Sequence, residues 1–336
     1  MNELGMESGT GTARARNIIK VIMTKQESSI ILATLLYVII VTCVNSVFIT
    51  PSNLFNILRS AGFTLITTVG MTLVLITGGL DLSVGSVLAL GGVVTGIALR
   101  AGLPLPLALL VGIAVGVIIG SINGFIVVKA GVPPLIVTLG MMYAARGLVS
   151  VITQGVPIYP LPKEFQMIEQ SSILNIPVIV YVAVLTAILG HMILARTAFG
   201  RSICAVGGNA EAARISGINT KKVIFYVYVL TSALAAITGI FMSARLGSAE
   251  AAAGTGFELT VICAAIIGGT STFGGMGSII GATVGALFME ILSNSLTLMH
   301  ISVYWQNLVV GTILVLAVLL DQYKRRWLLR NSIKRY

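Results

Sequence analysis

Long uncharged apolar runs, separated by short polar segments, set the pattern of the chain. An α-helix needs about 20 apolar residues to cross a bilayer, and most of the runs approach that length. They predict an all-α integral membrane protein with ten transmembrane helices, at residues 29–48, 61–77, 83–99, 105–128, 134–153, 176–194, 223–246, 257–268, 278–298 and 303–320. The eighth run is short for a crossing, so we expect its helix to begin before Phe257 or to continue past Gly268.

Composition supports the membrane assignment and limits what else the chain can hold. Of the 336 residues, 56% are hydrophobic and only 10% are charged, whereas about a quarter of the residues in soluble domains are charged. Ten crossings use roughly 200 residues, which leaves too few for a soluble catalytic domain of ordinary size. We therefore expect a cytoplasmic tail at 1–28, a membrane domain at 29–320 and a basic cytoplasmic tail at 321–336.

Basic residues are distributed unevenly between the two sides of the membrane. With a cytoplasmic N-terminus, sixteen Lys and Arg residues fall on the cytoplasmic side, Arg146 lies within a span, and four fall outside, namely Arg59, Arg100, Lys163 and Arg245. Cytoplasmic loops carry the excess of Lys and Arg in membrane proteins, so both termini are predicted to be cytoplasmic. The net charge of +10 is therefore assigned to the membrane edge and not to nucleic acid. The basic tail at 321–336 is expected to lie on anionic lipid or, alternatively, to bind a partner.

The sequence lacks the usual combinations for catalysis, metal binding or nucleotide binding. Cys43, Cys204 and Cys263 are far apart and are expected to be buried apolar side chains, and His191 and His300 are too few for a metal site. No Gly-x-x-x-x-Gly-Lys-[Ser/Thr] loop occurs, so ATP is not bound by that route. The chain is therefore predicted to be no enzyme by itself, with neither a metal nor a cofactor of its own.

Two glycine-rich junctions interrupt the apolar runs, one at 77–86 and the other at 268–277. Backbone that leaves helical geometry at membrane depth must find partners in protein or in a watery cavity, and broken helices of this kind occur beside transport routes. A tight turn at the cytoplasmic face explains each junction equally well. Their common pattern, with glycine pairs about 190 residues apart, hints at an internal repeat.

Four charged residues lie in or near apolar surroundings, where charges usually face the interior of a bundle. Asp81 can face the bundle interior, or it can cap the helix that follows it. Glu258 can face the interior too, or it can be an acidic residue in the first turn of its helix, where the helix dipole favours a negative charge. Arg146 either reaches the outer headgroups or pairs with a carboxylate or with carbonyls near the outer mouth. For Glu290 the sequence indicates no role.

Two segments between the runs are long enough to have structure of their own. Residues 155–175 are predicted to form an outer loop or a short surface helix, and residues 195–222 form the only long cytoplasmic loop. In the latter, Asn209 can cap a short helix that runs through Ser216, and Gly217 can end it in a left-handed turn. Glu211 and Arg214, three residues apart, share a face of this helix. Such a helix can seat in a partner's groove, or it can lie on the membrane surface.

Five segments together carry a family resemblance: 78–86 (Gly-Gly-Leu-Asp-Leu-Ser-Val-Gly-Ser), 134–140 (Pro-Leu-Ile-Val-Thr-Leu-Gly), 146–147 (Arg-Gly), 200–218 with its Gly-Gly-Asn centre, and 267–275 with Ile-Gly-Gly-Thr-Ser. They resemble the permease subunits of bacterial ATP-binding-cassette (ABC) importers for monosaccharides, the ribose, arabinose and xylose group. The resemblance extends from the second span to the ninth. Thr260 departs from it, because relatives often carry Asp there, and Glu258 is thereby left without an acidic neighbour.

The resemblance implies a division of labour among several proteins. The fold would be a type II ABC importer permease bundle in the bacterial inner membrane, paired with a second permease chain as a homodimer. An ATPase with tandem nucleotide-binding halves would bind ATP and Mg, and an extracytoplasmic binding protein would deliver the sugar. The chain would then form the pathway for a ribose-like pentose or a hexose, without binding it tightly.

Motifs and resemblance together give two sets of candidate residues. The coupling helix and its ATPase contact would involve Arg201, Gly208, Asn209, Glu211, Ala212, Ala213, Arg214, Ser216 and Gly217. The pathway or gate would involve Gly79, Asp81, Ser83, Ser86, Thr138, Arg146, Glu258, Thr270 and Ser271.

Three alternatives compete with the sugar permease. An ABC permease for a nucleoside or a branched-chain amino acid would have related glycine-rich junctions. An ion-coupled secondary transporter would use Asp81 or Glu258 as its ion site. A membrane scaffold without transport activity would leave the junctions and the charges within the spans unexplained.

Overall fold

The computed structural model describes the backbone of residues 26–333 and the side chains of residues 30–323. The first 25 residues of the predicted N-terminal tail and most side chains of the predicted C-terminal tail therefore lie outside the described residues. The described elements are α2 (Gln26–Val44), η1 (Ser46–Ile49), α3 (Pro51–Ile76), α4 (Val84–Arg100), α5 (Leu105–Phe125), η2 (Ile126–Ala130), α6 (Pro134–Thr153), α7 (Lys163–Gln170), β1 (Ser172–Ile173), β2 (Ile176–Pro177), α8 (Val178–Arg196), α9 (Ala198–Gly208), α10 (Ala210–Ile215), α11 (Thr220–Leu246), α12 (Phe257–Ile267), α13 (Ile279–Leu298) and α14 (Val303–Ile333).

Seven of the described helices are long and apolar enough to cross a membrane, and three shorter apolar helices lie at 30–44, 84–100 and 257–267. Each of the ten predicted runs thus corresponds to one apolar helix of the structure. The expectation that the helix at 257–268 extends further is wrong, because α12 ends at Ile267 after 11 residues. At 1.5 Å per residue it covers only about half of a bilayer core of about 30 Å. A second difference lies at the last span, where α14 does not end at Leu320 but continues to Ile333.

The bundle is built around α3 and α11, the most enclosed of the long apolar helices, whereas α14 is the least enclosed. Close helix approach explains this arrangement. Gly116 and Gly120 of α5 meet the backbone of α11 at Ser232 and Tyr228, so that a Cβ on either glycine would overlap a carbonyl oxygen. Small residues at helix contacts let backbones approach in a membrane bundle, where dispersion and hydrogen bonds replace the hydrophobic effect.

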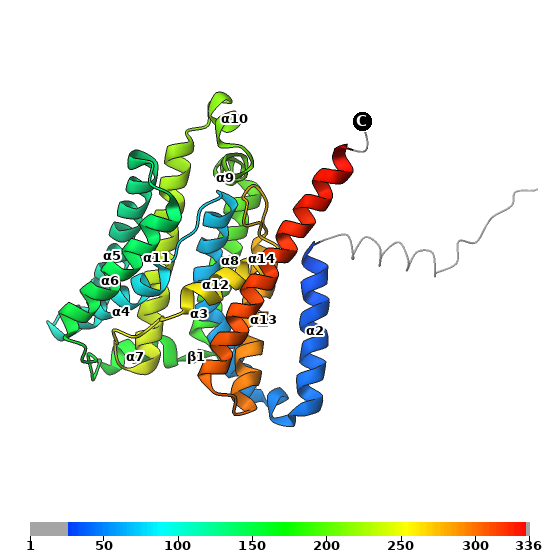
Figure 1. Cartoon of the computed structure of the whole chain (residues 1–336). Helices are drawn as coiled ribbons and strands as arrows, with labels where there is room; N and C mark the ends of the chain where they lie inside the picture. The colour runs from blue at the N-terminus through cyan, green and yellow to red at the C-terminus, as the bar shows by residue number, and fades with distance from the viewer. Residues whose placement is uncertain (1–25, 334–336) are drawn as a thin grey trace, which may run out of the picture.

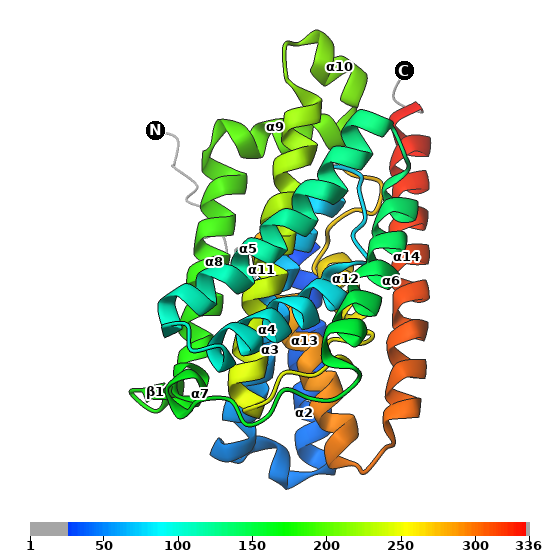
Figure 2. The same ribbon diagram turned by 90° about the vertical axis from the view of Figure 1, so that its left-hand side faces the viewer.

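The two ends of the bundle differ. One end carries α10 and the C-terminal end of α14, while α7 and the hairpin of β1 and β2 lie at the opposite end (Figures 1 and 2). The predicted short surface helix within 155–175 is confirmed as α7. At its end of the bundle, Glu169 of α7 forms a 3.0 Å ion pair with Arg59 of α3. Burial raises the pKa of Glu169, and the charge of Arg59 lowers it in part.

The three cysteines differ in their surroundings and all are free. Cys263 of α12 is buried, as expected, and Cys204 of α9 is partly buried. The expectation of burial is wrong for Cys43, which is exposed. Its helix, α2, lies at the edge of the bundle in Figure 1 and packs mainly against α13, where the Tyr37 hydroxyl is 2.6 Å from that of Ser295.

Candidate functional site

Both glycine-rich junctions begin with the same helix-ending motif. At Gly78 after α3 and at Gly269 after α12, φ is positive, +78° and +94°. Each of these glycines donates its N–H to the carbonyl three residues back, and the next residue donates to the carbonyl five residues back, over 2.8–3.0 Å. This is the Schellman pattern, which needs a left-handed residue and therefore favours glycine. The glycine pairs of the sequence thus mark two equivalent helix ends.

A buried polar cluster follows the first helix end. The Oδ1 atom of Asp81 accepts hydrogen bonds from the Ser83 backbone N–H (2.9 Å) and from the Ser83 hydroxyl (2.6 Å). Asn123 of α5 donates its side-chain amide to the same hydroxyl over 3.0 Å. All three side chains are fully buried. Asp81 therefore holds Ser83, the residue at the N-cap position of α4, and links the start of α4 to α5.

The carbonyl of Leu80 fixes the same junction to two more helices. It accepts hydrogen bonds from the Thr138 hydroxyl of α6 (3.2 Å) and from the Tyr228 hydroxyl of α11 (3.3 Å). Gly79 lies so close to the Tyr228 hydroxyl that a Cβ there would come within 2.7 Å of it. The first junction is thus anchored by side chains from α5, α6 and α11.

The second junction has a different anchor. The Oδ2 atom of Asp321, on α14, accepts hydrogen bonds from the Thr272 backbone N–H (3.0 Å), the Thr272 hydroxyl (2.9 Å) and the Ser271 hydroxyl (3.3 Å). Thr270 and Ser271 are buried, whereas Phe273 and Met276 are exposed. This loop is therefore tied to the last helix of the chain.

The two junctions meet each other and the end of α9 through backbone alone. The Gly275 N–H donates to the carbonyl of Ile76, the last residue of α3, over 2.8 Å. A Cβ on Gly207 of α9 would overlap both that carbonyl and the Gly275 nitrogen. A Cβ on Gly274 would lie only 2.8 Å from the Gly207 carbonyl oxygen. No side chain separates the three segments at this point, so α9 is in direct backbone contact with the end of α3 and with the second junction.

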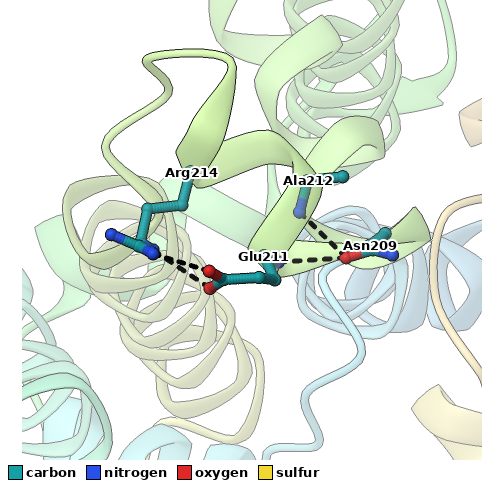
Figure 3. A network of polar contacts seen from close by, with 4 residues as sticks. All are labelled: Asn209, Glu211, Ala212 and Arg214. Atoms are coloured by element: carbon teal, nitrogen blue, oxygen red, sulfur yellow. Dashed lines mark hydrogen bonds and ion pairs between the residues drawn. The ribbon is translucent and has the colours of Figure 1, made fainter.

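The predicted short helix follows α9 at this end of the bundle. Asn209 caps α10 through its side-chain oxygen, which accepts from the backbone N–H groups of Glu211 (3.1 Å) and Ala212 (3.0 Å), as Figure 3 shows. Glu211 and Arg214 form a 2.6 Å ion pair, and this hydrogen bonding lowers the pKa of Glu211. Gly217 follows with φ +85°. The cap, the shared face and the left-handed turn are thus confirmed, and α9 is an additional helix in the predicted loop.

The exposure of the α10 residues shows which of them are accessible. Ala213 is buried, whereas Glu211, Ala212, Arg214, Ser216 and Gly217 are exposed. Arg201 of α9 is exposed too, as are Gly208 and Asn209. Apart from Ala213, each of the predicted coupling residues is therefore accessible.

Arg146 of α6 pairs with backbone carbonyls. Its guanidinium donates to the carbonyls of Ala251 and Ala253, the latter over 2.6 Å. Both belong to the non-helical segment between α11 and α12. Of the two expectations for Arg146, pairing with carbonyls describes the structure. Glu258 is in the first turn of α12, as expected, and its carboxylate lies against Gly85 of α4.

The structure places the nine pathway candidates in several segments of the bundle. Gly79, Asp81, Ser83 and Thr138 lie at the first junction, Thr270 and Ser271 at the second, Arg146 and Glu258 flank the segment before α12, and Ser86 is buried in the first turn of α4. Sequence reasoning missed their partners Asn123, Tyr228 and Asp321, and it missed the contact between Glu290 and the Thr64 hydroxyl (2.5 Å). A lone Asn within the apolar run at 105–128 was the one available signal, for Asn123.

Comparisons with known proteins show which family the chain is similar to. The family described as "Branched-chain amino acid transport system / permease component" matches residues 53–318. The ribose import permease protein of Bacillus subtilis is 41% identical over 74% of this chain and 78% of its own length. The D-allose transport system permease protein of Escherichia coli is 37% identical over 74% and 76%, and the L-arabinose transport system permease protein of the same species is 36% identical over 75% and 77%. No solved structure matches the chain.

Proposed function

This chain belongs to the family of permease components of ABC transport systems, and we propose that it forms the membrane pathway of an ATP-driven importer for a monosaccharide. Relatives named for ribose, allose and arabinose import support the solute class. The observation that carries the mechanism is the backbone contact of Gly207 with Ile76 and Gly275, because it links α9, next to α10, to both glycine-rich junctions.

We place both termini and α10 on the cytoplasmic side, with ten crossings. The sixteen-to-four distribution of basic residues supports this orientation. The α10 surface would contact a separate ATPase with tandem nucleotide-binding halves, which binds ATP and Mg. A second permease chain would complete the pathway as a homodimer. A binding protein would deliver the sugar at the end of the bundle that carries α7.

The proposed cycle begins when the ATPase closes on ATP and moves the two α10 helices of the dimer toward each other. α10 is joined to α9 through the single residue Asn209, whose side chain caps α10. α9 then bears on Ile76 at the end of α3, which stays in place, and displaces the loop at Gly275. Packed helix ends of this kind move as rigid bodies, so the bundle changes between inward-facing and outward-facing states.

The coupling role of α10 is tested by charge reversal. Glu211→Lys replaces an ion pair by two like charges three residues apart and presents the wrong charge to the ATPase. We expect uptake of labelled sugar by the reconstituted complex to fall at least tenfold, while the amount of permease in the membrane stays the same. Wild-type uptake by this variant would contradict the assignment.

The double variant Glu211→Arg, Arg214→Glu separates two explanations of such a loss. It restores an ion pair within α10 but keeps the reversed charge at each position. Persistent loss of uptake would show that the residues act on the ATPase, whereas full recovery would show that they only stabilise α10.

The identity of the transported solute needs its own test, because the description of the matching family names branched-chain amino acid transport. The complex should be purified with its ATPase, and its binding protein should be screened by calorimetry against ribose, allose, arabinose and leucine. We expect binding of a monosaccharide. Binding of leucine alone would overturn the solute class and leave the ABC mechanism intact, and uptake abolished by collapse of ion gradients with ATP maintained would overturn the mechanism.

A further inference from the structure

A shallow apolar groove lies on the outside of the bundle, between the second half of α5 and the first half of α11. Its volume is about 460 Å³, and it is lined by Val117, Ile118, Ser121, Ile122, Phe125 and Phe225. The one polar side chain among them, Ser121, donates its hydroxyl to the carbonyl of Val117 over 2.7 Å. The groove therefore offers no free polar group along its length and suits a hydrocarbon chain.

The floor of the groove follows from the close contact of the two helices. Gly124 of α5 faces Phe225 of α11, and a Cβ there would lie 3.1 Å from the Phe225 Cα. Large side chains flank this contact, and Ile118 and Phe125 remain 55% and 57% exposed. An exposed apolar surface that lies between two spanning helices faces lipid, so its natural occupant is an acyl chain.

Three lysines stand at one end of the groove. Lys129 follows Phe125 by four residues in η2, and Lys221 and Lys222 precede Phe225 by four and three residues in α11. These spacings put each lysine on the groove face, about one helical turn beyond the phenylalanines. All three lysines are exposed. The C-terminal end of α5 and the N-terminal end of α11, which adjoin these lysines in the chain, lie toward the end of the bundle that carries α10 (Figure 2).

The charge of these lysines is not compensated locally. α5, η2 and α11 contain no Asp or Glu. Within the part of the chain that the structure describes, the ion pairs are Arg59 with Glu169 and Arg214 with Glu211, so none of the three lysines is paired. An exposed aromatic ring, Tyr226, lies beside Phe225 in an edge-to-face contact, with centroids 5.4 Å apart. Exposed tyrosines are typical of the headgroup level of a membrane.

We propose that this groove is a binding site for an anionic phospholipid. One acyl chain lies against α5 and α11, and the phosphate lies among Lys129, Lys221 and Lys222. Basic pockets between spanning helices bind anionic headgroups in this way. In the orientation proposed above, the lipid comes from the cytoplasmic leaflet, and it packs against the helix that connects α10 to the rest of the bundle.

Native mass spectrometry of the detergent-purified complex tests the site, with phosphatidylglycerol and phosphatidylcholine of identical chains as probes. We expect the wild type to retain phosphatidylglycerol in preference to phosphatidylcholine. The triple variant Lys129→Gln, Lys221→Gln, Lys222→Gln should lose about fivefold in apparent affinity for phosphatidylglycerol per lysine, from roughly 1 kcal/mol each, hence on the order of 100-fold. Phosphatidylcholine has the same phosphate but no net charge, so its affinity should fall by less and the preference for phosphatidylglycerol should disappear. Arg196→Gln, at an exposed basic residue of α8, is the matched control and should keep the preference.

A groove variant distinguishes the site from general attraction of anionic lipid to a basic surface. Ser121→Trp should fill the groove and weaken retention of both lipids alike. An equal affinity of the wild type for the two lipids would overturn the proposal. It would also be overturned if the triple variant kept its preference for phosphatidylglycerol but lost the ATPase during purification, because the lysines would then belong to the ATPase contact.

Discussion

The two glycine-rich junctions end their helices identically and then differ in almost every contact. After Gly78 the chain enters a fully buried cluster, in which Asp81 and Ser83 are bound to each other and to Asn123. After Gly269 the chain forms a loop with exposed side chains, which one carboxylate, Asp321, holds to α14. Side chains of α5, α6 and α11 bond to the first junction, whereas the side chain that holds the second, Asp321, comes from α14.

From this difference we infer which junction moves in the proposed cycle. A buried hydrogen-bond network with anchors on α5, α6 and α11 moves only with the whole bundle. The second junction has fewer anchors, so it can follow α9 while the first junction stays in place. We therefore assign the first junction as the fixed point of the proposed cycle and the second as its moving part. The experiments below test this assignment, from the largest expected effect to the smallest.

The largest effect is expected where the junctions meet. Gly207→Leu forces a side chain onto the backbone of Ile76 and Gly275, and backbone cannot rotate away as a side chain can. We expect a loss of about 1–3 kcal/mol or more in the free energy of unfolding, seen as a lower melting temperature in detergent, together with loss of uptake. Gly208→Ala is the control for stability, because a Cβ on Gly208 meets nothing within 4 Å. Equal melting of the two variants would contradict the backbone contact.

The next effect is expected at the buried cluster of the first junction. Asp81→Ala removes the acceptor of two hydrogen bonds, so the buried N–H and hydroxyl of Ser83 are left without that acceptor. We expect the free energy of unfolding to fall by about 1–3 kcal/mol, measured by thermal denaturation. Asp81→Asn keeps a side-chain oxygen at the same position and should recover most of the loss. An Asn variant as unstable as the Ala variant would show that the charge, and not the acceptor, is needed.

A smaller effect is expected at the anchor of the second junction. Asp321→Ala removes the acceptor for Thr272 and Ser271, but Asp321 is only partly buried, so water can replace part of what is lost. We expect a cost of about 0.5–1.5 kcal/mol, below that of Asp81→Ala, in the same melting experiment. A larger cost than for Asp81→Ala would reverse the assignment of fixed and moving junctions.

The smallest effect needs no substitution. Amide hydrogens at 272–277 should exchange with deuterium faster than those at 79–84, because the second junction has fewer buried contacts and opens at lower free energy. Hydrogen exchange measured on the detergent-solubilised complex, read by mass spectrometry at peptide resolution, compares the two segments within one sample. Equal exchange of both segments would show that the second junction is held as firmly as the first.

Local features of this fold were predictable from sequence, and long-range partners were not. The cap of α10 and its left-handed end depend on Asn209 and Gly217 themselves, so the pattern predicted them correctly. The partners of Leu80 and Ser83 lie on helices far along the chain, namely Tyr228 of α11 and Asn123 of α5. No spacing rule connects such positions, which is why the candidate residues could be named but not their contacts.

The short α12 illustrates the same limit. Hydropathy suggested a helix of full length, but Gly254 and Gly256 adopt left-handed conformations before it. The carbonyls of Ala251 and Ala253, which would otherwise be costly to bury, are satisfied by Arg146 of α6. A helix is therefore not required in this segment, and the reason lies about a hundred residues away in the sequence.

The contact of Gly207 with Ile76 and Gly275 has a consequence for the evolutionary record of this protein. Residue pairs that touch through side chains can exchange volume, one growing as the other shrinks, and this leaves a correlated signal among descendants. Where main chains touch directly, as at Gly207 and Gly275, a larger residue at one position cannot be accommodated by a smaller residue at the other. We therefore expect covariation methods to give no signal at the contact through which the proposed cycle transmits movement.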